Sequence, residues 1–330
     1  MNPTPVLEIT RLRKHFPISR GLLASFRRRS AHSVHAVDDI SFQVQPGEIL
    51  ALVGESGCGK TTTAKLLMGL EQPSGGTIHF CGQDVATFDL KQMRRQIQMV
   101  FQDPYESLNP RMTVFEIVAE PLNVHHLARS REDRIDRVKR ALKDAGLKPA
   151  ESYFNRLPHE LSGGQRQRVV IAAALVLEPT VLLADEPVSM LDVSIRAEIL
   201  NLLTELRQTR GISVLFITHD LGTVAYFADR IAVMYLGRIV EIGPARDVLS
   251  NPQHPYTKAL LSVVPVPNPR LRRERIILQG ETPNPIDLPG GCRFHPRCPV
   301  AIEQCRQIDP PYVELSNSHR AACLLIESVL

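Results

Sequence analysis

The sequence lacks a long hydrophobic run. Across 330 residues the longest uninterrupted apolar stretch runs from Val169 to Leu177 and is closed by Glu178. A helix needs about 20 apolar residues to span a bilayer, so a membrane-spanning helix is not expected. The opening residues, MNPTPVLEIT, show no basic segment followed by an apolar core, so no secretory signal is expected either. These two absences predict a cytosolic chain.

A large excess of charge of one sign is also missing. The chain has 39 Lys+Arg and 35 Asp+Glu, a net charge of +4, with 43% hydrophobic and 22% charged residues. This composition is ordinary for a soluble globular protein. It argues against a disordered chain and against a nucleic-acid binder that works by bulk charge. One stretch differs: no acidic residue lies between Glu8 and Asp38, where Arg20 and Arg27–Arg29 occur. Such a stretch is either a solvated basic loop or a contact for an anionic partner or a membrane surface.

Cysteine is too scarce for a disulfide scaffold, because six residues in 330 do not make one in a reducing cytosol. Twelve of the 25 prolines lie after Asn251. This shift in composition predicts a domain boundary near residue 250, with a main domain over residues 1–250 and an extension over 251–330. Four cysteines fall within the last 39 residues: Cys292, Cys298, Cys305 and Cys323.

Buried strands alternate with helices in the main domain. Continuous apolar runs predict strands at 49–54, 181–185 and 213–220. Apolar residues at helical spacing predict helices over 60–69, 131–146 and 195–207. Strands and helices in alternation indicate an α/β fold with a largely parallel sheet.

The segment Gly54-Glu-Ser-Gly-Cys-Gly59-Lys60-Thr61 matches the phosphate-binding P-loop, G-x-x-x-x-G-K-[ST]. It lies between a predicted buried strand and a predicted helix, as the mechanism requires, which disfavours an incidental glycine-rich turn. Backbone N–H groups and the helix N-terminus then favour a phosphate. Lys60 reaches the β- and γ-phosphates, and Thr61 ligates Mg²⁺. The predicted phosphate-binding residues are Gly54, Ser56, Gly57, Cys58, Gly59, Lys60, Thr61 and Thr62.

Cys58 allows two interpretations. Lys60 and the helix N-terminus would give its thiol thiolate character. Alternatively, Cys58 is an inert small residue that fills the loop.

Asp185 ends the predicted strand VLLAD, and Glu186 follows it by one residue. A carboxylate at the end of a buried strand is costly unless it holds a cation, and Mg²⁺ beside a P-loop is the expected one. Glu186 is the candidate general base for the attacking water. Two adjacent acids could instead cap the next helix. The motifs together indicate an ATPase or GTPase.

The segment Leu161-Ser162-Gly163-Gly164-Gln165 follows the P-loop by about 100 residues and resembles the signature of the ATP-binding-cassette (ABC) ATPases, and further motifs match in family order. The resemblance implies a P-loop ABC core with a helical subdomain at about 104–175, and two ATP molecules sandwiched between two ATPase subunits. The implied roles are a Q-loop glutamine on Mg²⁺, a D-loop over 189–192, a switch histidine and an aromatic residue on adenine. Gln102 matches the Q-loop glutamine, His219 the switch histidine and Phe16 the aromatic residue. The signature residues are Ser162, Gly163, Gly164 and Gln165.

The segment from Asn251 to Leu261, NPQHPYTKALL, resembles the C-terminal extension of oligopeptide and dipeptide importer ATPases. Without the resemblance it indicates an amphipathic helix that buries Tyr256, Leu260 and Val263. The resemblance implies a peripheral ATPase at the cytoplasmic face of the inner membrane that powers peptide import. Its implied partners are a second, paralogous ATPase, two permease subunits docked near residues 105–122, and an extracytoplasmic solute-binding protein, with no nucleic acid.

Two other functions compete with this one. Importers of nickel, glutathione or another small solute would carry the same motifs, because specificity lies in other subunits. A soluble ABC ATPase acting on DNA or ribosomes usually carries a coiled-coil insertion or a second cassette, and neither is visible.

The four cysteines of the extension allow three interpretations. They are free thiols placed by chance, ligands of a structural zinc, or ligands of an iron–sulfur cluster. Zinc usually uses C-x₂₋₄-C knuckles, which are absent here. A cluster tolerates wider spacings, and some members of the peptide-importer family carry a 4Fe–4S cluster on four cysteines of this extension. The resemblance therefore favours the cluster.

Overall fold

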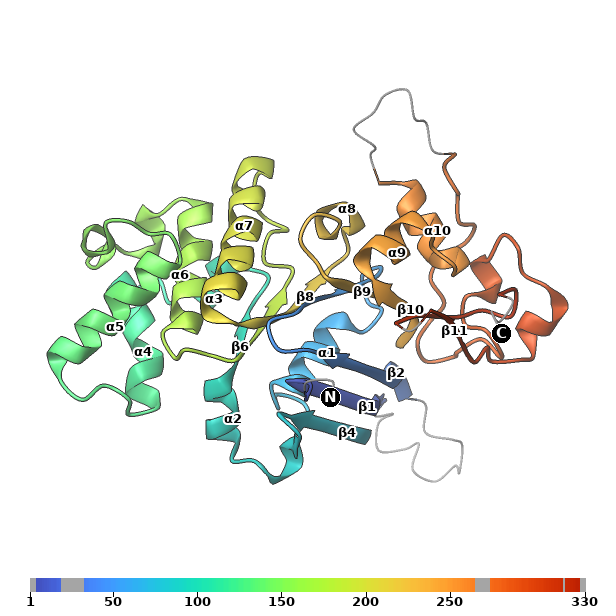
Figure 1. Ribbon diagram of the computed structural model, residues 1–330, viewed down its shortest axis with the longest axis horizontal. Coiled ribbons are helices and arrows are strands. Elements are labelled where there is room, and N and C mark those ends of the chain that lie inside the picture. The colour runs from blue at the N-terminus through green and yellow to red at the C-terminus, as the bar shows by residue number, and fades with distance from the viewer. Residues whose placement is uncertain (1–3, 19–32, 265–273, 317, 327–330) are drawn as a thin grey trace. The chain divides into compact units, whose positions relative to one another are not determined.

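The computed structural model describes residues 4–18, 33–264, 274–316 and 318–326 (Figure 1). Arg20 and Arg27–Arg29 of the basic stretch lie outside these ranges. The chain divides into two compact units, each assembled from separate segments. The first unit comprises Met1–Leu7, Val44–Ile49 and His79–Ile217, and the second comprises Glu8–Gln43, Leu50–Ile78 and Thr218–Leu330.

Three parallel strands form the sheet of the first unit. The order is β6 (Ile97–Val100), β7 (Val181–Asp185), β8 (Ser213–Thr218), with parallel pairing throughout. Every residue of β7 and β8 is buried, which explains why both sequences are continuous apolar runs. The predicted strands at 181–185 and 213–220 are thus confirmed, whereas β6 was not predicted.

The first unit contains two of the predicted helices, those over 131–146 and 195–207, as α5 and α7. Helix α5 confirms the helix predicted over 131–146, and Val138 and Leu142 on its inner face are fully buried. In Figure 1, α4, α5 and α6 gather into one group. The helices are α2 (Leu90–Gln96), α3 (Pro104–Ser107), α4 (Val114–Val124), α5 (Arg131–Asp144), α6 (Gly163–Leu175) and α7 (Val193–Arg210). Short elements are β5 (Gln83–Asp84), η2 (Val85–Thr87), η3 (Ala150–Tyr153) and η4 (Pro158–Glu160).

Two sheets build the second unit. In one, β1 (Leu7–Pro17) lies between β2 (Ser33–Val44) and β4 (Gly75–Phe80). In the other, β3 (Ile49–Val53) pairs in parallel with β9 (Arg230–Tyr235), and β9 pairs antiparallel with β10 (Arg238–Pro244). The parallel arrangement predicted from the sequence therefore holds for β3 and β9, while β10 adds an antiparallel strand.

Two strands of the extension continue the second sheet, which the sequence did not predict. Strand β12 (His319–Ala322) pairs antiparallel with β10, and β11 (Tyr312–Ser316) pairs with β12. Helix α10 buries Tyr256 but ends at Ser262, so the expected burial of Val263 is wrong: half of Val263 is exposed. The other helices of this unit are α1 (Lys60–Leu67), α8 (Leu221–Val224), α9 (Ala245–Ser250), α10 (Pro255–Ser262), η5 (His295–Arg297) and η6 (Glu303–Arg306).

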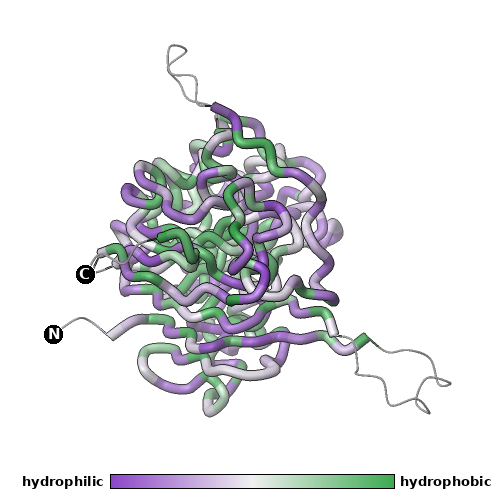
Figure 2. Tube along the Cα trace, turned by 90° about the vertical axis from the view of Figure 1, so that its right-hand side faces the viewer, coloured by the Kyte–Doolittle hydropathy of each residue, from purple (hydrophilic) through white to green (hydrophobic). Residues whose placement is uncertain are grey.

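Figure 2 colours the chain by hydropathy, and hydrophobic (green) segments alternate along it with hydrophilic (purple) ones. Strand β3 is buried at all five residues. Among the described residues, every helix is too short or too polar to cross a membrane.

Candidate nucleotide-binding site

The P-loop follows β3 and leads into α1, as its sequence predicted. A Cβ atom on Gly54 would come within 2.1 Å of the Met234 carbonyl oxygen, and one on Gly59 within 2.1 Å of the Ala36 carbonyl oxygen. Gly59 also has φ +110°, in the region that only glycine adopts without strain. The loop therefore wraps tightly between two backbone segments because two of its positions lack side chains.

The Lys60 ammonium is held inside the loop. Lys60 is 5% exposed, and its Nζ donates to the Gly54 carbonyl at 2.8 Å and the Glu55 carbonyl at 2.9 Å. The N-cap residue of α1, Gly59, provides no side-chain cap for the first N–H groups of the helix. Uncapped N–H groups and a nearby ammonium make an anion site. Thr61 is exposed at this end, and Thr62 is half-buried.

Cys58 does not have the thiolate character suggested as one interpretation. The residue is 3% exposed, and burial raises the pKa of its thiol although Lys60 acts in the opposite direction. A buried thiol with a raised pKa is poorly reactive. The structure supports the other interpretation, a small residue that fills the loop.

Two further predicted residues lie in the same unit as the P-loop. Phe16 is half-buried on β1, and the Lys14 ammonium lies 4.7 Å from the centre of its ring. His219 is exposed and stands between β8 and α8. The next residue, Asp220, caps α8 by accepting from the N–H of Gly222 at 2.9 Å, so the backbone around His219 is fixed.

The two strand-end acids lie in the first unit with Gln102. Asp185 is 4% exposed. Glu186 has φ 46°, a left-handed conformation that is strained for a residue with a side chain, and its N–H donates to the Ile217 carbonyl at 2.9 Å. The Gln102 side-chain amide donates to the Glu186 carboxylate at 3.1 Å. The structure thus joins the Q-loop glutamine to the candidate base.

The D-loop begins on a turn around Glu186. Both the N–H and the hydroxyl of Ser189 donate to the Glu186 carbonyl, at 3.1 and 3.0 Å. Strain at a residue in such a turn is a common property of functional sites.

The signature forms the N-terminus of α6. Ser162 is the N-cap: its hydroxyl accepts from the Gln165 N–H at 3.3 Å, and the Gln165 side chain accepts from the Ser162 N–H at 3.1 Å. A Cβ on Gly164 would lie 2.6 Å from the Ile195 side chain, so glycine allows α6 to pack against α7, while Gly163 next to it is half-buried. The exposed Ser162 hydroxyl and the helix N-terminus suit an anionic ligand.

None of the four cysteines of the extension forms a disulfide. The Cys292 N–H donates to the Cys305 carbonyl at 2.9 Å. Burial raises the pKa of Cys292 to about 11, and the thiols of Cys305, Cys323 and Cys298 add to the shift. Within the described residues, only His15, His35 and Asp38 bring three ligand atoms within 4.8 Å of one another. The cysteine sulfurs therefore do not meet at the spacing of ligands on a single ion.

Sequence analysis missed residues of the extension that contact the P-loop. The Arg297 guanidinium pairs with the Glu55 carboxylate at 2.7 and 3.1 Å, and the Tyr256 hydroxyl accepts from the Glu55 N–H at 2.9 Å. No local pattern connects residues about 200 or more positions apart. The only available signal was an acidic residue inside a phosphate-binding loop, which calls for a cationic partner.

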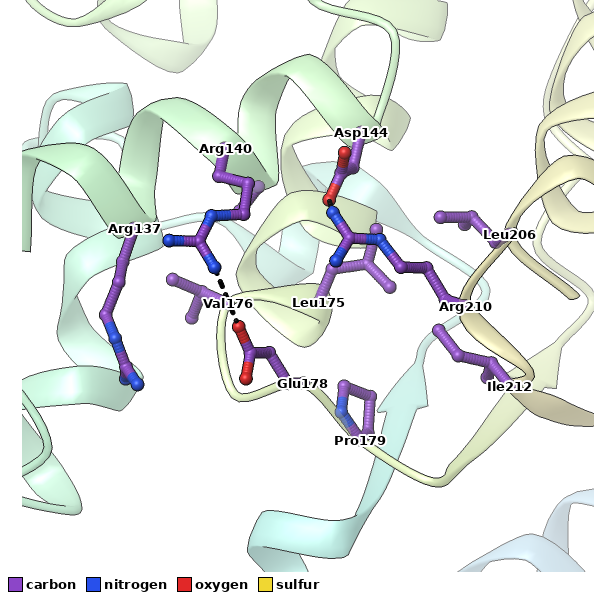
Figure 3. Close-up of a pocket in the computed structure, with 11 residues that line it drawn as sticks. Arg137, Arg140, Asp144, Leu175, Val176, Glu178, Pro179, Leu206, Arg210 and Ile212 are labelled. Atoms are coloured by element: carbon purple, nitrogen blue, oxygen red, sulfur yellow. Dashed lines mark hydrogen bonds and ion pairs between the residues drawn. The ribbon is translucent and has the colours of Figure 1, made fainter.

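A hollow of about 220 Å³ in the first unit lies away from the motifs (Figure 3). None of the predicted site residues lines it. Four of its charged residues pair with one another, Arg140 with Glu178 at 3.2 Å and Arg210 with Asp144 at 2.5 Å. Arg137, which also lines it, pairs with Asp133 outside the lining at 3.7 Å. This neutralisation gives no reason to assign it a ligand.

Comparison with known proteins agrees with the motifs. Residues 37–189 match the ABC transporter family, and residues 240–305 match the oligopeptide/dipeptide transporter C-terminal region. The chain is 47% identical over 330 residues to the oligopeptide transport ATP-binding protein AppF of Bacillus subtilis strain 168, covering 98% of each. It is 46% identical over 327 residues to the oligopeptide transport ATP-binding protein OppF of Salmonella typhimurium strain LT2, covering 98% of this chain and 96% of that protein.

Solved structures show the same core. One is cbiO1 from Clostridium perfringens, part of the ABC transporter complex cbiONQ, with TM-score 0.64 and 29% identity over 75% of this chain and 92% of that chain. Another is the ATP-binding cassette MJ0796 as a dimer in a post-hydrolysis state with ADP and Pi, with TM-score 0.63 and 30% identity over 73% of this chain and 99% of that chain. The P-loop, the strand-end acids, the signature and both family matches lead to one conclusion: the chain belongs to the ATP-hydrolysing subunits of ABC transporters that carry the oligopeptide/dipeptide C-terminal region.

Proposed function

We propose that this ATPase powers the import of peptides across the cytoplasmic membrane. The observation that carries the proposal is the combination of an intact ATPase motif set with residues 240–305, which match the C-terminal region of oligopeptide/dipeptide transporters. The relatives named oligopeptide transport ATP-binding proteins align over nearly the whole chain. Two functions compete with this one: the import of nickel, glutathione or another solute, and the activity of a soluble ABC ATPase. The named relatives favour neither.

In the proposed reaction each residue has one task. Lys60 binds the β- and γ-phosphates, and the loop N–H groups hold the phosphate oxygens. Mg²⁺ supplies charge neutralisation, and the donors that would hold it are the Thr61 hydroxyl, the Gln102 side-chain oxygen and the Asp185 carboxylate, all oxygens of the kind that this ion prefers. Glu186 takes the proton of the attacking water.

The remaining motif residues complete the nucleotide site. His219 contacts the γ-phosphate, and Phe16 stacks on adenine. The signature, Ser162 to Gln165, acts on the ATP held by a second ATPase subunit, since a dimer is the form in which the similar cassette MJ0796 was solved. Closure of such a dimer drives two membrane subunits, which dock near residues 105–122 at the cytoplasmic face of the inner membrane. A solute-binding protein supplies the peptide from outside.

The proposed organisation follows the sequence. Residues 1–250 form the ATP-binding domain, residues 104–175 its helical subdomain, and residues 251–330 the extension. The match to the C-terminal region covers residues 240–305 and so overlaps the proposed extension over residues 251–305.

Uptake by the complete transporter tests the proposal. The chain is assembled with its membrane subunits and binding protein in vesicles that contain Mg-ATP, and the uptake of labelled peptides, Ni²⁺ and glutathione is compared. We expect peptide uptake that disappears with Lys60→Ala. Uptake of Ni²⁺ or glutathione but not of peptide would show that the transporter imports that solute instead of peptides. A rate of ATP hydrolysis that stays the same with and without the membrane subunits would favour a soluble ATPase.

We further propose that Cys292, Cys298, Cys305 and Cys323 hold a 4Fe–4S cluster. The four cysteines are outside any disulfide, and the backbone hydrogen bond between Cys292 and Cys305 brings two of these positions side by side, which supports it. Their spacing disfavours zinc, because a single ion needs its ligands closer together than a cluster that binds each thiolate at a different iron. Purification without air, followed by assays of iron, sulfide and zinc in wild type and Cys298→Ser, tests this. Stoichiometric zinc without iron would show a zinc site, and no metal at all would leave free thiols.

A further inference from the structure

Glu55 is an acid inside the phosphate-binding loop, one residue after Gly54. A carboxylate here opposes the function of the loop in two ways: it repels a triphosphate and attracts the Lys60 ammonium that must reach it. In the structure the carboxylate is bound by side chains of the extension. The Glu55 carboxylate accepts two hydrogen bonds from the Arg297 guanidinium, at 2.7 and 3.1 Å, and a third from the Thr282 hydroxyl at 2.8 Å.

The pair is sheltered and its geometry is specific. The Arg297 side chain is 10% exposed and the Glu55 side chain 29%. Two parallel hydrogen bonds between a guanidinium and a carboxylate fix both charge and orientation, which a lysine cannot reproduce. Burial raises the pKa of the Glu55 carboxyl, but the hydrogen bonds from Arg297 and Thr282 outweigh burial and hold the pKa below its ordinary value.

The backbone of Glu55 is held by the extension as well. Its N–H donates to the Tyr256 hydroxyl at 2.9 Å. Tyr256, Tyr235 and Phe294 pack against one another with ring centres 4.7 to 5.4 Å apart, and each is buried. Phe294 precedes Arg297 by three residues, so the turn that carries Arg297 is anchored in this aromatic cluster.

A second arginine fixes the same turn. Arg293 donates to the Leu236 carbonyl and pairs with the Asp38 carboxylate, and its side chain is 9% exposed. The guanidinium of Arg297 therefore projects from a segment that is anchored just before it, at Arg293 and Phe294, and is placed before any nucleotide arrives.

We propose that Arg297 is a positioning residue of the nucleotide site: with Tyr256 it turns Glu55 toward the extension, which keeps the carboxylate away from Lys60 and shapes the loop for the triphosphate. This rests on the proposed function that the P-loop binds ATP. It goes beyond that function because it makes the C-terminal segment a part of the nucleotide site of its own chain.

ATP affinity of the full chain, measured by calorimetry, tests the proposal. Arg297→Ala leaves the Glu55 charge uncompensated, so we expect ATP to bind about tenfold more weakly. Glu55→Gln is expected to bind ATP more tightly than wild type, because it removes a negative charge. The double variant Glu55→Gln/Arg297→Ala is expected to regain most of the lost affinity. Arg306→Ala is the matched control, because Arg306 lies in the same segment with 67% of its side chain exposed.

Three outcomes separate positioning from general damage. A double variant that binds as weakly as Arg297→Ala would overturn the proposal, since the effect would then not act through the charge of Glu55. The weakening should also shrink as salt rises, because salt screens charges; a constant ratio of affinities would contradict it. If Arg297→Ala does not fold, Arg297→Lys replaces it. We then expect an intermediate loss of ATP affinity, and an unchanged affinity would count against the proposal. Absence of ATP binding by the wild type would instead refute the proposed function.

Discussion

Glu241→Ala is expected to lower the stability of the second unit strongly. Glu241 lies in the middle of β10 and is 0% exposed. Its carboxylate accepts from the backbone N–H of Gln253 at 2.8 Å and of His254 at 2.9 Å, and lies 2.8 Å from the His319 Nε2. One side chain thus connects β10 to the start of α10 and to β12.

The size of the effect follows from these partners. Hydrogen bonds to a charged group contribute about 1.5–3 kcal/mol each and are not additive. Removal of one partner from a buried charged network costs about 3–5 kcal/mol, because the remaining groups stay buried and unpaired. At roughly 2–4 °C for each kcal/mol, the midpoint of thermal unfolding should fall by roughly 10 °C. Glu314→Ala is the control, since Glu314 is exposed on β11, and a change within about 0.5 kcal/mol is expected there.

The same network predicts a pH dependence. Burial raises the pKa of the Glu241 carboxyl, but hydrogen bonds, from His319 first, outweigh burial and hold its pKa below the ordinary value of 4.5. A depressed pKa in the folded state means that the stabilisation is present above pH 4.5 and is lost as the pH falls through the folded pKa. Denaturant unfolding of wild type and Glu241→Ala should therefore differ by a constant free energy at neutral pH and by less below pH 4.5. A difference under about 1 kcal/mol at pH 7 would refute the reasoning.

Glu186→Gln should lower ATP turnover by about 10²–10⁴-fold while ATP binding persists, because the amide keeps the shape and loses the base; phosphate release by the assembled transporter measures it, and near-wild-type turnover would remove Glu186 from this role. At neutral pH an alkylating agent should modify the exposed Cys81 well before the buried Cys58, with or without ATP. Mass spectrometry of the labelled peptides measures this, and rapid, ATP-sensitive labelling of Cys58 would contradict the structure. Gly59→Ala should abolish ATP binding, since its Cβ would meet the Ala36 carbonyl at 2.1 Å; an unchanged affinity would show that the loop can shift.

What the sequence predicted well depends on contacts that are local along the chain. The P-loop was predictable because a buried strand, a glycine pattern and a helix follow one another over residues 49–67. The strands β7 and β8 were predictable because both faces are covered, which requires continuous apolar runs. Helix α5 was predictable because the residues of its buried face, among them Val138 and Leu142, recur at helical spacing along the sequence.

What the sequence did not reveal depends on partners far along the chain. Strand β10 contains Glu241, a residue that a strand normally turns toward solvent. Its burial depends on distant partners, the His319 side chain and the backbone N–H groups of Gln253 and His254. Strand β12 joins β10 across about 80 residues, and its sequence HRAA has no strong strand propensity. The end of α10 at Ser262 was missed because Val263 continued the apolar spacing.

The charges of the second unit show why the extension is part of the ATPase core. Three acids of the main domain are paired with residues beyond 250: Asp38 with Arg293, Glu55 with Arg297, and Glu241 with His319. Sheltered carboxylates are stable only when paired. A chain that ended near residue 250 would leave all three without these partners, one of them inside the phosphate-binding loop. The extension therefore supplies charge partners for three acids of the main domain, one of them in the phosphate-binding loop.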